Sequence, residues 1–199
     1  MDINPDTLES QIPYYLTRDQ KEGLIKALSD FNETPFARGY YTSLYMEETL
    51  QGDGWSGLEV IRFETGDRNQ IKGIILSNTC DISPENIREV PPKIVFAPLI
   101  KLKKYEKLLL TKGLKKVQIN AKLKAIRKQS VTTMFYLPSG GYLDEEYVAI
   151  LDDLHSIPSN VFLDNNKRNK LFTLSMFGFY LFLFKLSVHF CRFHENLER

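Results

Sequence analysis

The polar residues that follow a short apolar run at residues 73–76 are the first place in this chain where chemistry could occur. The run, GIIL, is too short for a helix and rich in β-branched side chains, which predicts a strand buried on both faces. The residues that come directly after it are Ser77, Asn78, Thr79, Cys80 and Asp81. Because loops at strand ends present reactive groups from a rigid scaffold, this loop is a candidate for catalysis or recognition. The alternative is that its side chains only cap and turn the backbone, with Cys80 as a small buried hydrophobe.

A thiol nucleophile would need a base, and the sequence offers His155 as a partner for Cys80, with Asp81 as the third group. No spacing ties these residues together, because any cysteine and histidine can be paired in this way. The histidines of the chain are His155, His189 and His194. They lack the paired spacing of zinc ligands, and a step of five residues puts the last two on different helical faces. We therefore expect no metal site and no cofactor.

The segment 101–128 carries a second chemical signal, a concentration of positive charge. It holds eleven Lys or Arg residues and one acid, Glu106, so it stands at +10 in a chain whose formal net charge is +1. Such a stripe could neutralise the phosphates of a nucleic acid. The residues assigned to it are Lys103, Lys104, Lys107, Lys112, Lys115, Lys116, Lys122, Lys124, Arg127 and Lys128. The alternatives are a solvated helical face or a basic surface matched by acidic ones elsewhere in the chain.

Composition places the chain among ordinary globular proteins. Its 199 residues are 43% hydrophobic and 26% charged, which suits one domain with a real core. Its two cysteines are far apart in sequence, and no signal peptide is visible at the amino end. These features predict free thiols and a cytoplasmic protein.

Short strands flanked by helices are the elements expected to position these residues. Strands are predicted over 55–63, 73–76, 93–100, 132–137 and 147–151. An amphipathic helix is predicted over 18–31, and one or two basic helices, separated at Gly113, within 101–128. Strands and helices do not alternate along the chain, so a parallel sheet is not predicted. We therefore predict a single α+β domain with a helical region over 1–35, a small barrel over 51–163 that carries the basic insertion, and a hydrophobic helix over 164–199.

The stretch 171–190 is the most hydrophobic part of the chain, and its length is close to that of a bilayer span. Lys185 and His189 lie inside it, and a charge near the middle of a span costs on the order of 3 kcal/mol. We therefore predict a helix from about 167 to 196 that packs into the core, or into an interface with a protein partner or a second copy. A membrane anchor is the alternative.

The order of elements from 51 to 105 resembles the MazF and PemK toxin family of small, strongly bent β-barrels. Gln51, Gly52 and Asp53 lie where that family opens its first strand with a GD turn. GIILSN at 73–78 resembles a family strand that ends in LS or LSN, and VFAPLI at 95–100 resembles the next strand. These patterns cover about a quarter of the chain, and the loop at 77–83 is also similar to one in uncharacterised bacterial proteins.

The resemblance implies a protein related to toxins that cleave RNA in toxin–antitoxin pairs. The family's ribonucleases use an arginine just before the LS strand and a threonine or serine at the end of the next one. Here the first position is Lys72, which lacks the planar fork of arginine, and the second falls at Ile100 or Lys101. We therefore expect a non-catalytic or weakly catalytic bacterial accessory protein, possibly of a toxin–antitoxin or mobile-element system, that docks on a protein or nucleic acid. The alternative is an endoribonuclease with Lys72, Ser77 and Asp81 at its site.

Overall fold

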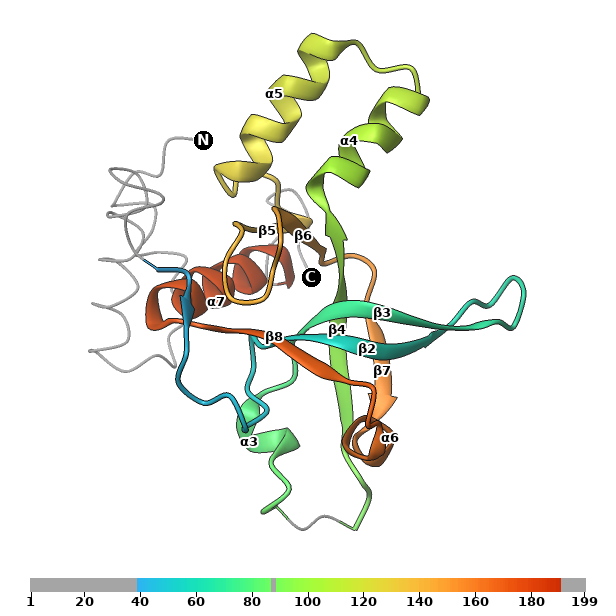
Figure 1. Ribbon diagram of the computed structural model, residues 1–199, viewed down its shortest axis with the longest axis vertical. Helices are drawn as coiled ribbons and strands as arrows, with labels where there is room; N and C mark the ends of the chain where they lie inside the picture. The colour runs from blue at the N-terminus through green and yellow to red at the C-terminus, as the bar shows by residue number, and fades with distance from the viewer. Residues whose placement is uncertain (1–38, 87–88, 191–199) are drawn as a thin grey trace, which may run out of the picture.

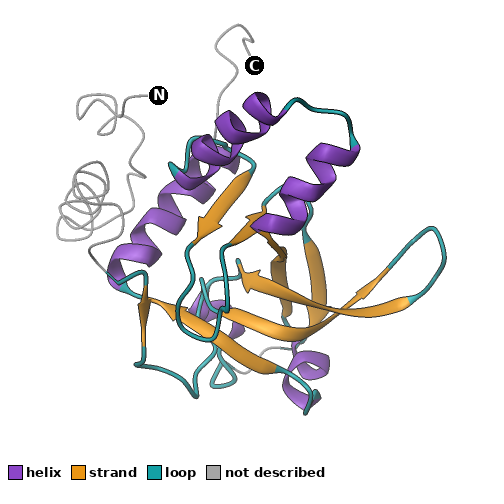
Figure 2. Ribbon diagram, turned by 45° about the horizontal axis from the view of Figure 1, so that its top comes forward, coloured by secondary structure: helices purple, strands orange, loops and turns teal. Residues whose placement is uncertain are grey.

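The computed structural model of the chain describes residues 39–86 and 89–190 (Figure 1). The helix predicted over 18–31 lies outside these residues, as do Cys191 and His194. Within them, an antiparallel sheet of eight strands curls into a half-barrel, and five helices surround it (Figure 2). The chain therefore has the α+β architecture that its sequence predicts.

The sheet has the strand order β1-β8-β2-β3-β4-β6-β5, and β7 pairs with β4 beside this path. Its strands are β1 (Tyr41–Thr42), β2 (Gly54–Ile61), β3 (Arg68–Ile75), β4 (Lys93–Lys101), β5 (Met134–Leu137), β6 (Tyr147–Ile150), β7 (His155–Pro158) and β8 (Asn169–Leu174). The five predicted strands correspond to β2 to β6. The strand predicted from residue 73 already begins at Arg68, because the preceding polar residues pair with β2.

The hydrophobic C-terminal stretch is not one helix, so the prediction of a helix from residue 167 is wrong in its first part. Residues 169–174 form β8, which hydrogen-bonds to β2 on one side and to β1 on the other. The helix α7 (Met176–Phe190) begins only after Ser175, whose Oγ accepts a hydrogen bond from the Gly178 amide at 3.2 Å, as a helix N-cap does. Two ladders of backbone hydrogen bonds hold this apolar run in the sheet, and the barrel therefore extends beyond 51–163.

Helix α7 packs along the sheet and contributes to the main core. Its Leu181 and Phe182 are buried against β-strand residues such as Phe135 and Phe172. Gly178 allows close approach, since a Cβ there would stand 2.5 Å from the Tyr40 carbonyl oxygen. None of the helices in the described part of the chain is long and apolar enough to cross a membrane. The interface role predicted for this helix stays a prediction.

The basic segment forms a helical hairpin that projects from the barrel at the top of Figure 1. Its helices are α4 (Leu102–Thr111) and α5 (Lys116–Arg127), as the sequence predicts, and Gly113 separates them with a φ of +81°. The hairpin has its own apolar core, made of Leu102, Tyr105, Leu109, Ile119, Leu123 and Ile126 with Tyr136 and Val148 of the sheet. Two short helices complete the fold, α3 (Thr79–Ile82) and α6 (Ser159–Asp164).

Candidate functional site

The loop at 77–81 is held by capping and turn contacts. Asn78 caps the short helix α3, because its Oδ1 accepts a hydrogen bond from the Cys80 amide at 2.9 Å. Ser77 Oγ accepts one from the Val95 amide at 2.8 Å, and Thr79 Oγ1 accepts one from the Gln51 amide at 3.0 Å. Three of the five polar side chains in the loop therefore stabilise the backbone.

The three candidate catalytic residues come from different elements of the chain. Lys72 lies on β3, where its Nζ donates a hydrogen bond to Tyr147 Oη at 2.9 Å and stands 5.0 Å from the centroid of that ring. Ser77 lies beyond the end of β3 at Ile75, where its Oγ accepts a hydrogen bond from the Val95 amide. Asp81 follows in α3. The structure thus places Lys72 on β3, beside Tyr147.

The thiol and the candidate base are also placed on different elements. Cys80 is an exposed free cysteine on α3, whereas His155 lies on β7. The His155 ring stacks on Phe96 at a centroid distance of 5.7 Å, and its Nε2 lies 3.3 Å from Asp153 Oδ1. Among residues 39–86 and 89–190, no group of three or more His, Cys, Asp or Glu side chains is arranged to hold a metal ion.

The root of the α4–α5 hairpin is the part where α4 begins and α5 ends, next to the sheet. It forms ion pairs with an acidic strip that precedes β6 and consists of Asp144, Glu145 and Glu146. Arg127 forms a two-pronged pair with Glu146, Nε to Oε1 and Nη2 to Oε2, both at 2.7 Å. Lys101 Nζ lies 2.9 Å from Asp144 Oδ2 and 2.6 Å from Glu145 Oε1, and Lys103 Nζ lies 3.8 Å from Glu145 Oε2. Three of the eleven cations in 101–128 are therefore matched internally.

Hydrogen bonds favour the ionised forms of Asp144 and Glu146 at the hairpin root. The bond from Lys101 lowers the pKa of Asp144, and the bonds from Arg127 lower the pKa of Glu146. Tyr136 donates its hydroxyl to Glu146 at 2.6 Å, and burial followed by this bond raises the pKa of the phenol. Both carboxylates therefore remain ionised at neutral pH, and the hairpin stays anchored to the sheet.

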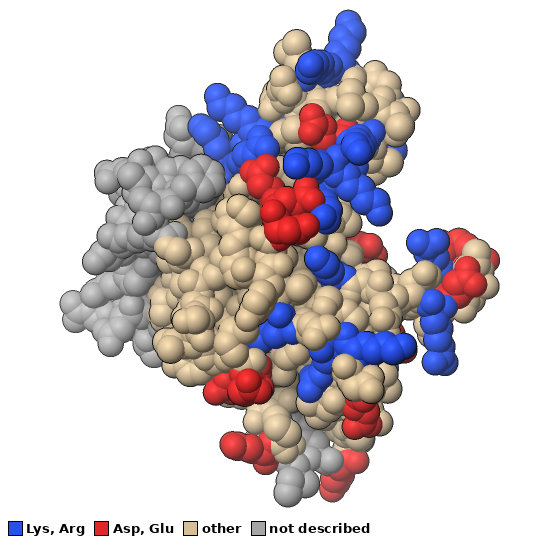
Figure 3. Space-filling view, viewed as in Figure 1, with Lys and Arg blue, Asp and Glu red and all other residues tan. Residues whose placement is uncertain are grey.

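The remaining cations of the segment behave differently. These hairpin lysines are Lys104, Lys107, Lys112, Lys115, Lys116, Lys122, Lys124 and Lys128. All eight are exposed, and none forms an ion pair with another residue of the described chain. Figure 3 shows blue side chains gathered over the projecting hairpin. The hairpin lysines are therefore a concentrated positive surface that no acid of residues 39–86 and 89–190 neutralises.

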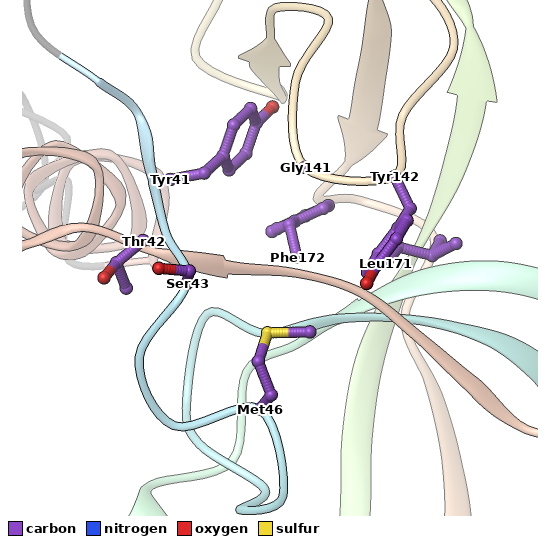
Figure 4. A pocket seen from close by; sticks show the side chains of 8 residues that line it. All are labelled: Tyr41, Thr42, Ser43, Met46, Gly141, Tyr142, Leu171 and Phe172. Carbon is purple, nitrogen blue, oxygen red and sulfur yellow. The ribbon is translucent and has the colours of Figure 1, made fainter.

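Two hollows flank Tyr41, and Figure 4 shows the one that Met46 and Tyr142 line. One, of about 330 Å³, is lined by β1 residues, Met46, Tyr142 and Phe172, and the other, of about 460 Å³, lies against the turn at 138–141. Tyr41 Oη donates a hydrogen bond to the Pro138 carbonyl at 2.7 Å and so fixes the wall that both share. Neither hollow is lined by an acid, a base or a thiol, so neither offers a catalytic group other than tyrosine and hydroxyl side chains.

Sequence reasoning missed the acidic strip, although DEE at 144–146 is the only run of three acids in the chain. The strip faces the hairpin because β4 and β6 pair with Lys101 opposite Tyr147, and that register cannot be read from the sequence. Comparisons with known proteins give no counterpart to this arrangement. No family model, no curated protein and no solved structure matches the chain.

Proposed function

We propose that this chain is a non-catalytic or weakly catalytic binding protein that docks on nucleic-acid phosphates through the hairpin lysines of α4 and α5. One observation carries the proposal. Eight exposed cations project together from the barrel without an acid partner in the described chain, while the neighbouring acidic strip binds only the three cations at the root. A surface of this kind attracts polyanions, because neutralising their phosphates releases condensed counterions.

The hairpin suits contact with the backbone better than reading of bases. Lysine is a point charge on a long, mobile stem, and phosphate contacts of this type carry no sequence information. The one aromatic residue of the hairpin, Tyr105, is 8% exposed and packs in the hairpin core, so it offers no stacking surface. Binding is therefore expected to be independent of sequence and strongly dependent on salt.

The family resemblance supports the same class of partner. The segments that resemble MazF and PemK proteins lie directly before β2, at the end of β3 and in β4, and these three strands are neighbours in a curled antiparallel sheet. We infer a MazF/PemK-like barrel that keeps a nucleic-acid partner, as an accessory protein of a bacterial toxin–antitoxin or mobile-element system. The proposal includes no cleavage step, because Lys72 Nζ is hydrogen-bonded to Tyr147 and Ser77 Oγ to the Val95 amide.

Binding of a labelled oligouridylate, followed by fluorescence anisotropy, tests the proposal. The variant carries Lys115→Gln, Lys116→Gln, Lys122→Gln and Lys124→Gln. Its matched control carries Arg62→Gln, Arg68→Gln, Lys93→Gln and Lys167→Gln, which removes the same charge at exposed positions outside the hairpin. We expect the affinity of the wild type to fall by about a thousandfold between about 50 and 200 mM salt, and the slope of log K against log salt to decrease by about 3 in the variant.

The control should keep most of the wild-type affinity. Equal binding by the hairpin variant and its control at low salt would show that the hairpin lysines do not contact the ligand. The absence of cleavage is tested separately by incubating labelled, unstructured RNA with the wild type and with Lys72→Ala. Cleavage by the wild type alone would overturn the non-catalytic part of the proposal.

A further inference from the structure

Arg168 occupies an unusual position at the end of the barrel remote from the α4–α5 hairpin. It lies in the connection between α6 and β8, which Figure 1 shows at the opposite end of the molecule from α4 and α5. Its guanidinium carbon stands 4.4 Å from the ring centroid of Phe162 and 5.1 Å from that of Trp55. These two rings meet edge to face at 5.3 Å, so the guanidinium rests on a rigid aromatic corner.

The charge of Arg168 has no partner among the described carboxylates. Lys170, a second cation near the Trp55 ring, is neutralised by the buried Asp53, with 2.8 Å between Nζ and Oδ2. Arg168 forms no such ion pair, and Asp164, the acid closest to it in sequence, is exposed at the end of α6. One uncompensated positive charge therefore remains at this aromatic corner.

Two hydrogen-bond donors at the corner also lack acceptors. Arg168 Nη1 and Trp55 Nε1 are both buried and have no hydrogen-bond partner among the described residues. Buried donors are nearly always satisfied in folded proteins, so two on neighbouring side chains indicate that an acceptor is missing. Burial without a counterion also lowers the pKa of Arg168, an effect that a bound anion would reverse.

Contacts of Gly57 and Asn165 fix the backbone at Arg168. Gly57 has a φ of +78°, and a Cβ there would stand 2.8 Å from the Lys167 carbonyl oxygen and 3.0 Å from Arg168 Cα. Asn165 Nδ2 donates a hydrogen bond to the Gly57 carbonyl at 2.7 Å, and the Arg168 amide donates one to the Asn165 carbonyl at 3.2 Å. The loop can therefore lie against β2 only because residue 57 is glycine, and the position of Arg168 follows from that contact.

We infer that Arg168 and Trp55 form a binding site for an oxyanion of the phosphate class. The planar fork of the guanidinium matches two phosphate oxygens, and the indole N–H is a further, neutral donor. Arg168 is partly exposed, so an anion reaches its outer edge from solvent. Arg168 Nη1 and Trp55 Nε1 are buried, so the proposal requires the neighbouring side chains to move aside when the anion binds. The anion is either a free phosphate or a phosphodiester of a nucleic acid, since the same donors suit both.

The site provides its own reporter, because Trp55 is the only tryptophan of the chain. Titration of the full chain with inorganic phosphate should change the Trp55 emission in a saturable manner, whereas sodium chloride at the same ionic strength should not. Arg168→Met should raise the half-saturation concentration roughly tenfold or more, the loss expected for a charge-assisted hydrogen bond. Arg168→Lys keeps the positive charge but loses the planar fork, so its half-saturation concentration should lie between those of the wild type and Arg168→Met.

An oligouridylate titration separates the two sources of the anion. It is read from Trp55 in the variant that lacks the four hairpin lysines, so that a failure of the hairpin proposal does not affect this test. A saturable response to either probe that Arg168→Met weakens supports the site, and the responding probe identifies the source. No saturable response to either, or the same half-saturation in Arg168→Met, overturns the inference. Circular dichroism checks folding, and Arg168→Lys serves as the test variant if Arg168→Met does not fold.

Discussion

The barrel and the hairpin hold their cations in opposite ways. In the barrel, the side chain of Lys170 is 5% exposed and is neutralised by Asp53, and Lys185 is 4% exposed and donates a hydrogen bond to the Gln129 carbonyl. On the hairpin, eight lysines reach solvent without an ion pair in the described chain. The two buried cations, Lys170 on β8 and Lys185 on α7, therefore affect the stability of the fold, whereas the hairpin lysines are available to a partner.

This difference has a thermodynamic consequence. Exposed charges contribute about 0–1 kcal/mol each, because water and salt screen them. Removing one partner of a buried pair costs about 3–5 kcal/mol, since the other charge stays in an apolar site without compensation. The comparison predicts that substitutions of the buried charges change stability and that substitutions of the hairpin lysines change binding.

The largest effect is expected for Asp53→Asn. Lys170 would keep its two backbone acceptors, the Tyr45 and Glu48 carbonyls, but its buried ammonium would lose its counterion. We expect the free energy of unfolding to fall by about 3–5 kcal/mol, measured by urea denaturation with Trp55 emission as the signal. Asp152→Asn, an exposed acid without an ion pair in the described chain, is the control. A loss below about 1 kcal/mol would mean that the pair is not effectively buried.

Lys185→Met should raise the free energy of unfolding, whereas Asp53→Asn lowers it. Burial lowers the pKa of Lys185 from 10.5 to about 8, so between these values the unfolded chain binds more protons than the folded one. The destabilisation is complete below pH 8 and fades as the pH rises towards 10.5. Methionine removes it, so the variant should be more stable than the wild type by about 1–3 kcal/mol at pH 7.

The stability difference between Lys185→Met and the wild type should then shrink when unfolding is repeated at pH 9 and 10. Lys167→Met, at an exposed position, should show no such trend. A difference that stays constant with pH would show that Lys185 is solvated in the folded protein.

A smaller effect is expected at the hairpin root. Arg127→Gln removes the two-pronged contact with Glu146, and both side chains are about one-third or more exposed, which weakens the pair. We expect a loss of about 0.5–1.5 kcal/mol. A double-mutant cycle with Glu146→Gln measures the coupling directly. Zero coupling would leave the hairpin anchored by its apolar residues alone.

The smallest change in stability is expected for the variant that replaces Lys115, Lys116, Lys122 and Lys124 by Gln. These side chains are exposed and lack acid partners in the described chain, so the free energy of unfolding should change by less than about 0.5 kcal/mol. The same variant should lose most of its nucleic-acid binding. A large change in stability would place these lysines with the barrel cations and remove the contrast between the two regions.

The local features of the fold could be predicted from the sequence. Runs rich in β-branched residues located β2, β3 and β4, and Gly113 separated two basic helices because their apolar residues recur with helical spacing. The strand β8 was missed because its apolar residues LFTL are followed, after Ser175 alone, by the equally apolar residues of α7. Only Ser175 marks the boundary, and a lone serine is a weak signal. The short strand β7 ends in a proline and has no pattern of its own.

The features that depend on tertiary pairing could not be predicted. Asp53 and Lys170 are far apart in sequence and meet only because β2 and β8 are neighbours. The same pairing brings Trp55 opposite Lys170 and close to Arg168, and nothing in the residue types alone indicates it. The basic segment was visible as a run of charge, whereas the division between matched and unmatched cations required the register of β4 and β6.

The attachment of the hairpin has a consequence for its motion. Its root residues pack on Tyr136 and Val148, but towards the tip the two helices contact each other, and Leu108, Leu110 and Val117 are exposed. Amide hydrogen exchange should therefore be slowest near Leu102 and Ile126 and become faster towards Gly113, while the barrel amides stay protected. The hairpin would then open as a unit of its own, and a bound polyanion would be recognised by slower exchange spreading from the root to the tip.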